Sequence, residues 1–269
     1  MFASFWLYAS LPPFLVALGV TRLLRPGRRK FGRTLAEIGP VLGFLAGFVG
    51  VVRGVPFLNN VAHHRIGEGA VLALAVAFAL ALTGPGPRLG RYAALGAAVL
   101  ALVWQAQGDD WPVVAVACLV ALLILDRLVF LARIGASAML VLALASLGLA
   151  MVAMSARAGL LGGLALALAA ASAGWLVWAR PFGSAKPGLA AAVSGGMVFV
   201  TLAFAVAQSA ARTPWSLAPL LACFWAEAIL RQLPFIARWA KRKQRRPAAL
   251  ALSAALPVAV AMVLGTILP

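Results

Sequence analysis

Ionisable residues inside apolar stretches are the first candidates for chemistry in this sequence. Glu227 lies deep in an apolar run, and Arg231 follows it at i+4, with Asp126 and Arg127 adjacent in another run. At the centre of a bilayer such groups cost about 2.5–3.5 kcal/mol on insertion scales, so each needs a partner or a function. We interpret Glu227 and Arg231 as a structural pair, with Arg231 reaching the headgroups, or as part of a substrate or proton path. Asp126 and Arg127 are interpreted as an interfacial pair or as members of that path.

Glu37 precedes Pro40 and a row of glycines at helical spacing, Gly39, Gly43 and Gly47. Glycines four residues apart make a smooth helix face that another helix can approach closely, and a proline frees a backbone carbonyl nearby. We expect Glu37 to lie at this helix interface, facing nearby arginines. A cation or proton site at Glu37 is the alternative.

A polar cluster lies between two apolar runs and consists of Asn60, His63, His64 and Glu68. If a helix begins near residue 61, His64 and Glu68 share a face at i and i+4. That spacing can hold a metal or tune a histidine near neutral pH. A metal site needs three or more ligands, however, and the chain has two histidines. We therefore predict no metal or cofactor here, and expect an outer gate or a loop at headgroup level.

Two stretches carry dense positive charge, and the net charge of the chain is +17. The basic residues alternate with apolar runs, so topology and anionic lipid headgroups account for them and nucleic acid is not expected as a partner. A phosphorylated lipid headgroup or an acidic partner protein is the alternative ligand. The residues expected to meet lipid or a partner are Arg28, Arg29, Lys30, Lys241, Arg242, Lys243, Arg245 and Arg246.

Patterns typical of enzymes do not emerge from the sequence. No histidine lies within an apolar run where it could activate a nucleophile, and no glycine-rich loop followed by lysine is present to cradle a phosphate. Both cysteines, Cys118 and Cys223, fall inside apolar runs at a spacing that supports neither a disulfide nor a zinc site. The sequence therefore favours a role that is not enzymatic.

The elements that must position these residues are membrane-spanning helices. Hydrophobic residues make up 64% of the 269 residues, against about 45–50% in a soluble domain. A helix needs around 20 mostly apolar residues to cross the hydrocarbon core. The sequence thus predicts an all-α, polytopic transmembrane bundle of about ten spans, with nine or eleven as alternatives, forming one integral membrane domain over 1–269. The predicted spans are 4–24, 35–52, 67–84, 91–107, 112–126, 136–156, 158–179, 189–208, 215–233 and 248–268.

Lysine and arginine stay on the cytoplasmic side of short loops, and this rule orients the predicted spans. Placing both termini outside puts the two dense basic stretches, together with Arg88, Arg91 and Arg180, on the cytoplasmic side. The acidic pair Asp109 and Asp110 then lies outside. The bias toward Ala, Leu, Val, Arg and Gly is typical of GC-rich bacteria. We therefore expect a multi-pass protein of a bacterial inner membrane.

Function follows from these features only as two competing hypotheses. Several proline-containing spans, short loops and a few intramembrane charges favour a small permease or carrier for an anionic, amphiphilic or lipid-linked solute. The scarcity of intramembrane polar groups instead favours a non-catalytic membrane subunit or assembly factor that packs against other membrane proteins. Membrane lipids are the expected partners in both cases.

Overall fold

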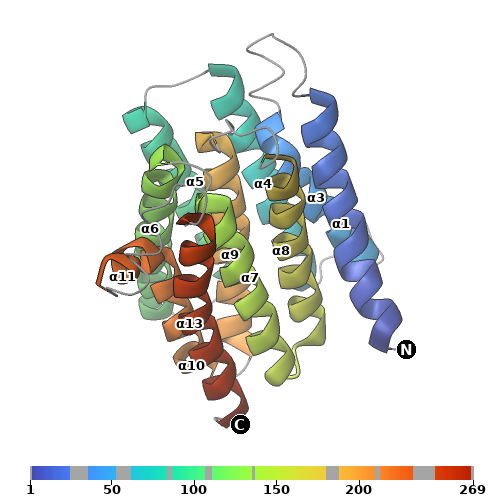
Figure 1. Cartoon of the computed structure of the whole chain (residues 1–269), viewed down its shortest axis with the longest axis vertical. Helices are drawn as coiled ribbons and strands as arrows, with labels where there is room; N and C mark the ends of the chain where they lie inside the picture. The colour runs from blue at the N-terminus through green and yellow to red at the C-terminus, as the bar shows by residue number, and fades with distance from the viewer. Residues whose placement is uncertain are drawn as a thin grey trace.

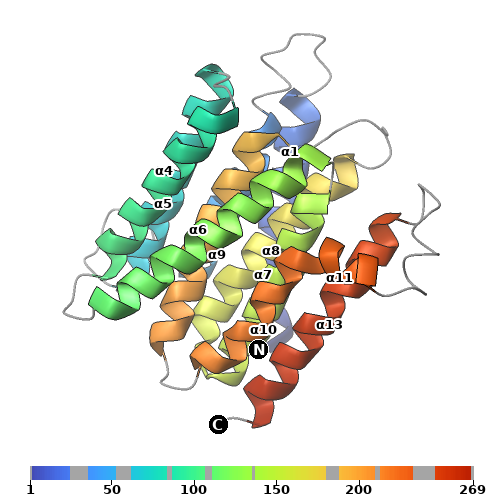
Figure 2. The same cartoon turned by 90° about the vertical axis from the view of Figure 1, so that its left-hand side faces the viewer.

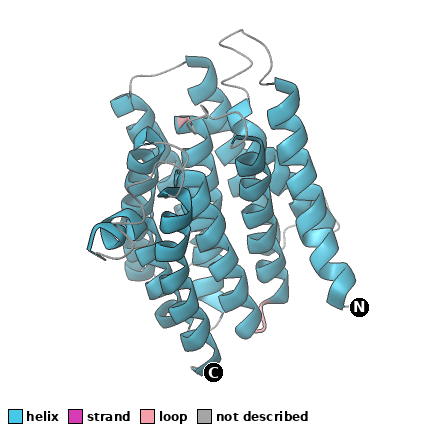
Figure 3. Cartoon of the chain, in the orientation of Figure 1, coloured by secondary structure: helices cyan, strands magenta, loops and turns pink. Residues whose placement is uncertain are grey.

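The computed structural model describes residues 2–24, 36–52, 62–83, 87–106, 111–134, 137–179, 188–209, 213–232 and 246–267. These ranges form helices, joined in places by short turns, and contain no strand (Figure 3). The elements are α1 (Phe2–Leu24), the 3-10 turn η1 (Ala36–Ile38), α3 (Gly39–Val52), α4 (Ala62–Thr83), α5 (Pro87–Ala106), α6 (Trp111–Ile134), α7 (Ser137–Ser155), α8 (Gly159–Ala179), α9 (Leu189–Ser209), α10 (Thr213–Ala222), the 3-10 turn η2 (Cys223–Trp225), α11 (Ala226–Gln232) and α13 (Arg246–Ile267).

Six apolar stretches of the described helices are long enough to cross a membrane: Arg65–Leu82, Trp111–Arg133, Ala138–Ser155, Gly159–Val177, Leu189–Ser209 and Ala248–Thr266. Four shorter apolar stretches accompany them, at Ala9–Leu23, Ala36–Val52, Leu95–Ala106 and Trp215–Leu230. Each of the ten overlaps a run that the sequence predicts, and the number of membrane crossings stays a prediction. The all-helical fold class is confirmed, and the apolar helices indicate a protein embedded in a membrane.

The centre of the bundle is α9. Within the protein, 83% of the Leu189–Ser209 stretch is buried, against 33% of Trp111–Arg133 in α6. Three groups of helices surround it: α1, α3 and α8; α4, α5 and α6; and α7, α10 and α13. In Figure 2, α4 and α5 lie along one edge of the bundle, and α10 and α13 lie along the opposite edge. A buried helix that contacts all three groups is apolar around its whole circumference, as the sequence of α9 is.

Close contact between α1, α3 and α8 depends on small residues. Gly43 of α3 is buried, and a methyl group added there would lie 2.5 Å from the carbonyl oxygen of Pro13 and 2.9 Å from the methyl groups of Ala17 and Ala171. At Gly47, the same addition would lie 2.7 Å from the methyl group of Ala167. The predicted close-packing face of α3 is thereby confirmed, with α1 and α8 as its partners.

Rows of exposed aliphatic side chains cover the outside of the bundle. Leu7, Leu11 and Leu15 follow one another at four-residue spacing along α1, and each is at least half exposed. Leu252 and Leu256 make a comparable row on α13. Figure 1 shows α1 at the edge of the bundle. Contiguous apolar surface of this kind is costly in water at about 25 cal/mol per Å². Lipid removes that cost, which supports a membrane setting.

Two elements differ from the predicted spans. Helix α6 continues to Ile134, so Asp126 and Arg127 lie inside the helix rather than at its inner end. The apolar residues that follow this pair extend the buried face and keep the chain helical. The predicted span 215–233 is interrupted by η2, and α11 leaves the direction of α10 (Figures 1 and 2).

Candidate ligand-binding cavity

A cavity of about 550 Å³ lies where the start of α4, the end of α5, the α7–α8 turn and the end of α9 meet. These helix ends belong to the same end of the bundle, because the helices alternate in direction along the chain. Its polar lining residues are Arg65, Gln105, Arg157, Gln208 and Ser209. Its apolar lining includes Ile66, Leu160, Leu161 and Ala205. The cavity therefore has the size and the mixed chemistry of a small-molecule site.

Gln105 is the most buried polar side chain of this cavity, with 9% of its surface exposed. Its amide nitrogen Nε2 donates a hydrogen bond to the backbone carbonyl of Thr201 in α9, at 3.3 Å. Since a carbonyl oxygen only accepts, the amide must present nitrogen to Thr201, and this fixes the orientation of the group. Its oxygen Oε1 is buried and accepts no hydrogen bond from the residues that the structure describes.

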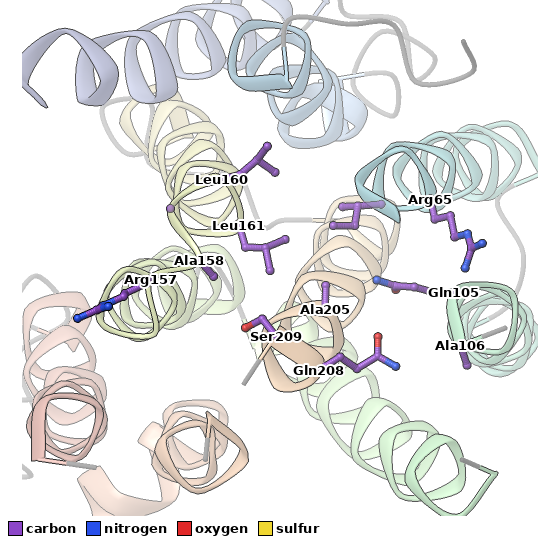
Figure 4. Close-up of a pocket in the computed structure, with 12 residues that line it drawn as sticks. Arg65, Gln105, Ala106, Arg157, Ala158, Leu160, Leu161, Ala205, Gln208 and Ser209 are labelled. Carbon is purple, nitrogen blue, oxygen red and sulfur yellow. The ribbon is translucent and has the colours of Figure 1, made fainter. Parts of the chain in front are cut away.

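Three of the polar side chains gather on one side of the cavity. Figure 4 shows Arg65 from α4, Gln105 from α5 and Gln208 from α9 turned toward one region. Leu160 and Leu161 of α8 also line the cavity, and in Figure 4 they lie on the other side of α9, with Leu161 turned toward α9. Arg65 is half-buried, which strengthens its electrostatic interactions relative to bulk water. The cavity thus presents one cationic, hydrogen-bonding wall and one aliphatic wall.

The α7–α8 turn also lines the cavity, through Arg157, Ala158 and Gly159. The N–H of Ala158 donates to the carbonyl of Ala153 at 2.8 Å, and that of Arg157 donates to the carbonyl of Met154 at 3.1 Å. These two bonds form a Schellman motif, which requires a left-handed residue, and Arg157 has a φ of 59°. In Figure 4 the side chain of Arg157 points away from the cavity. Arg157 therefore contributes to the shape of the turn and not to the cationic wall.

The predicted outer cluster is only partly described. Helix α4 begins at Ala62, so His64 and Glu68 stand four residues apart within one helix, as predicted. The carboxylate oxygen Oε2 of Glu68 accepts a hydrogen bond of 2.9 Å from the indole nitrogen of Trp104 in α5. This bond ties α4 to α5 beside the cavity. The side chains of His63 and His64 and the whole of Asn60 lie outside the described residues. In the described ranges, no group of three acidic, histidine or cysteine side chains is placed to hold a metal ion.

Two of the predicted intramembrane charges, Arg127 and Glu227, lie at the break between α10 and α11. Glu227 is 4% exposed and stands at the start of α11. The Nε of Arg127 donates to the backbone carbonyl of Phe224 in η2 at 3.2 Å, and its guanidinium lies 4.7 Å from the centre of the Phe130 ring. Arg127 thus bonds a carbonyl at the interruption of the helix. Arg231 follows in α11, with its side chain outside the described residues, and Asp126 is half-buried.

Glu37 lies in η1, where it approaches the beginning of α9. A side chain at Gly188 would collide with the carboxyl of Glu37. Gly188 precedes Leu189, and its carbonyl accepts a bond of 3.4 Å from the N–H of Ala192 as α9 begins. The carboxylate therefore stands at a helix N-terminus, where negative charge is favourable. The spacing of residues around Glu37 did not indicate this contact.

The two basic stretches are largely outside the described residues. Arg246 opens α13, but its side chain is not described. The others lie wholly outside the described ranges: Arg28, Arg29, Lys30, Lys241, Arg242, Lys243 and Arg245. Their contact with anionic lipid stays a prediction.

A second cavity, of about 270 Å³, lies between α6, α9 and α10. Its lining is aliphatic and aromatic and includes Val116, Ile124, Phe199, Phe204 and Leu221. A wall without hydrogen-bonding side chains can hold a hydrocarbon chain but cannot select an ion. The polar cavity is for this reason the stronger candidate site.

Sequence reasoning did not identify Arg65, Gln105 or Gln208 as site residues. The amide of a glutamine inside an apolar run is costly to bury unless it is hydrogen-bonded. Gln105 was therefore a candidate site residue on the same grounds as the charged residues. Comparisons with protein-family models, with curated proteins and with solved structures find no match for this chain. The geometry of the cavity and of the helix break is therefore the basis on which a function can be proposed.

Proposed function

We propose that this chain is a carrier that moves a small amphiphilic organic anion across a bacterial inner membrane. The observation that carries the proposal is the cavity with a cationic wall at Arg65 and Gln105 and an aliphatic wall at Leu160 and Leu161. Ligand pockets measure roughly 300–1,000 Å³, and this cavity falls in that range. An anion would meet Arg65 while its hydrocarbon part lies against the leucines.

The distribution of basic residues gives the proposed carrier its direction. If the basic stretches face the cytoplasm, the α7–α8 turn and the cavity face the outside. The structure would then correspond to a state that accepts solute from outside. Anionic headgroups would hold the cytoplasmic loops at the inner leaflet, with about 1 kcal/mol per basic residue.

The helix break supplies an element that could move during transport. Interrupted helices in membrane carriers expose backbone groups and allow segments to rearrange around a bound solute. Here Arg127 bonds the carbonyl of Phe224 at the interruption, and the buried carboxyl of Glu227 lies beside it. We propose that this region opens toward the cytoplasm in the alternate state, with Glu227 coupling the movement to a proton or a cation.

Uptake into proteoliposomes tests the proposal. Radiolabelled hexanesulfonate is a suitable probe, because its sulfonate stays charged and crosses bare lipid slowly. Vesicles with the purified chain should take it up faster than empty vesicles. Arg65→Gln should lower uptake about tenfold, since a charge-assisted hydrogen bond contributes about 1.5–3 kcal/mol. Glu227→Gln should also lower it, whereas Arg133→Gln, which changes an exposed arginine that does not line the cavity, should have no effect.

Uptake equal to that of empty vesicles would contradict the carrier. The competing proposal is a membrane subunit that packs against other membrane proteins, and the exposed aliphatic rows on α1 and α13 would suit such a partner as well as lipid. Purification in mild detergent separates the two. A carrier should run alone or with its own copies, whereas a subunit should bring stoichiometric partner proteins with it.

A further inference from the structure

The second cavity is a cleft that is exposed at one end and buried at the other. Its volume is about 270 Å³, and the side chains that line it come from α6, α9 and α10. Val113 and Val116 of α6 are 51% and 63% exposed, whereas Ile124, further along the same helix, is 2% exposed. A ligand would therefore enter beside Val113 and end near Ile124.

Apolar side chains line the cleft along one face of each helix. The lining residues of α6 are Val113, Val116, Ala117, Val120 and Ile124. They fall at i, i+3, i+4, i+7 and i+11, so they form one stripe along the helix. Every described residue that lines the cleft on α6, α9 and α10 is apolar. The cleft therefore suits a hydrocarbon chain and not a polar ligand.

The length of the cleft matches one leaflet of a bilayer. From Val113 to Ile124, the stripe on α6 runs about 16 Å at 1.5 Å per residue. The hydrocarbon core of a bilayer is about 30 Å thick, and one leaflet contributes about half of it. An acyl chain that follows α6 from Val113 to Ile124 thus stays within its own leaflet.

Two tryptophans mark the exposed end of the cleft. Trp111 begins α6 and Trp215 lies in the first turn of α10, and both side chains are exposed. Each precedes the first lining residue of its helix by two positions. Exposed indoles gather at the level of the lipid headgroups, with an apolar ring and a polar N–H. The exposed end of the cleft therefore lies where a phospholipid changes from headgroup to hydrocarbon.

The width of the cleft separates a lipid chain from a protein helix as its occupant. Its volume divided by its length gives a mean cross-section of about 17 Å². A helix with its side chains is about 10–12 Å in diameter and would need several times that area. An unbranched acyl chain is the narrowest hydrocarbon that a membrane offers. An empty cleft would instead forfeit dispersion contacts along its walls.

We infer that this cleft binds one acyl chain of a bilayer phospholipid, with the headgroup at the level of Trp111 and Trp215. The described residues that line it are all different from those that line the polar cavity. The lipid site is therefore independent of the proposed carrier, and either can fail without the other.

The buried end of the cleft adjoins the break between α10 and α11. The ring of Phe199, which lines the cleft, lies 5.3 Å from the ring of Phe224 in an edge-to-face arrangement. The carbonyl of Phe224 accepts the hydrogen bond of Arg127. An acyl chain that reaches Phe199 is thus one side chain away from the helix break.

Photolabelling tests where the chain lies. The purified full chain is reconstituted in vesicles of phosphatidylethanolamine and phosphatidylglycerol, with a trace of phosphatidylglycerol that carries a diazirine on one acyl chain. One sample is irradiated in the vesicles, and another after transfer to mild detergent and washing. Mass spectrometry of peptides then measures the label on 113–124 and 199–207. The reference is the label on the exposed leucines of α1 and α13, which meet only bulk lipid.

A retained phospholipid should keep its label in the cleft after washing. We expect the yield there to exceed that on the reference leucines at least about tenfold, which corresponds to about 1.4 kcal/mol. Equal yields after washing would mean that the cleft holds only passing lipid. A cleft that takes no label in the vesicles would mean that another protein segment covers it. Either result would overturn the inference without requiring any variant to fold.

Variants that fill the cleft should expel the chain. Ala117 is half-buried and lines the cleft, so Ala117→Phe should lower the label on 199–207 about tenfold. Ala218→Phe should do the same from α10, where Ala218 lines the cleft and is exposed. Ala115→Phe is the matched control, because Ala115 is exposed on α6 and does not line the cleft. Its labelling should equal that of the natural chain. Labelling that persists in either filled variant would overturn the inference.

Discussion

Glu37 brings its carboxyl to the start of α9, against the backbone of Gly188. The first N–H groups of a helix have no partner within it and carry partial positive charge. A carboxylate at that position stabilises a helix by about 0.3–1 kcal/mol, and by up to about 2 kcal/mol where it is partly buried. Glu37 is half-buried, so we assign it a structural contribution to the most central helix of the bundle.

Replacing Gly188 by alanine should destabilise the protein. The added methyl group would collide with the carboxyl of Glu37, which must then leave the start of α9. We expect a loss of about 1–3 kcal/mol, as for other overpacked positions. Thermal unfolding of the purified variant in detergent measures it. Gly159→Ala at the start of α8 is the matched control, because a methyl group there meets open space.

A double-mutant cycle can test the contact between Glu37 and Gly188. Glu37→Ala removes the carboxyl and should itself destabilise α9, but it also makes room for the methyl group at position 188. The penalty of Gly188→Ala should therefore shrink in the Glu37→Ala background. Additive effects of the two substitutions would mean that the contact between them does not contribute to stability.

At the scale of elements, α3 depends on glycines for its distance from α1 and α8. Gly43→Ala would place a methyl group 2.5 Å from the carbonyl oxygen of Pro13, and α1 and α3 would have to move apart. We expect destabilisation of about 1–3 kcal/mol in thermal unfolding, despite the better helix propensity of alanine. Gly19→Ala in α1 meets nothing within 4 Å and should be neutral or slightly stabilising. Equal effects at both positions would contradict close packing as the cause.

The break between α10 and α11 gives a second prediction at this scale. Arg127→Met should remove the hydrogen bond to the carbonyl of Phe224 and leave that carbonyl without its donor. Hydrogen bonds to charged groups contribute about 1.5–3 kcal/mol. Backbone amides of α11 should then exchange with deuterium more rapidly, as mass spectrometry of peptides from 226–232 would show. Arg133→Met changes an exposed arginine of the same helix and should leave the exchange of α11 unaltered.

The length of an apolar run predicts where a membrane-spanning helix lies. Such a helix must satisfy its backbone hydrogen bonds within itself, and the side chains that it exposes to lipid must be apolar. The predicted run 189–208 matches α9, and 158–179 matches α8, almost residue for residue. Length does not predict the interruption at η2. Nothing in the run 215–233 marks the carbonyl of Phe224 as the partner of Arg127, which lies 97 residues earlier in the chain.

The cavity could not be predicted either, because its residues come from helices that are far apart in the sequence. Gln105 and Thr201 are 96 residues apart and meet only because α5 packs on α9. A single sequence gives the polarity of each residue but not the rotation of each helix, and rotation decides which side chains share a wall. The contact between Glu37 and Gly188 likewise depends on how η1 lies against α9.

For the whole molecule, the central question is which face of the membrane each end of the bundle meets. The amino end of α1, the carboxyl end of α13 and the α7–α8 turn lie toward the same end (Figure 1). The basic stretches near residues 28 and 243 join helices at their other ends. Retention of basic residues on the cytoplasmic side then predicts that the cavity faces outward.

Labelling with a membrane-impermeant maleimide tests this arrangement. In intact cells, Arg157→Cys should react, because the turn between α7 and α8 faces outside. Arg28→Cys and Lys243→Cys, whose side chains lie outside the described residues, should react only after permeabilisation. The natural chain gives the background, since Cys223 is buried and Cys118 lies within α6. If positions 28 and 243 react from opposite sides of the membrane, an odd number of crossings separates them. The ten-span arrangement and the outward cavity would then both be wrong.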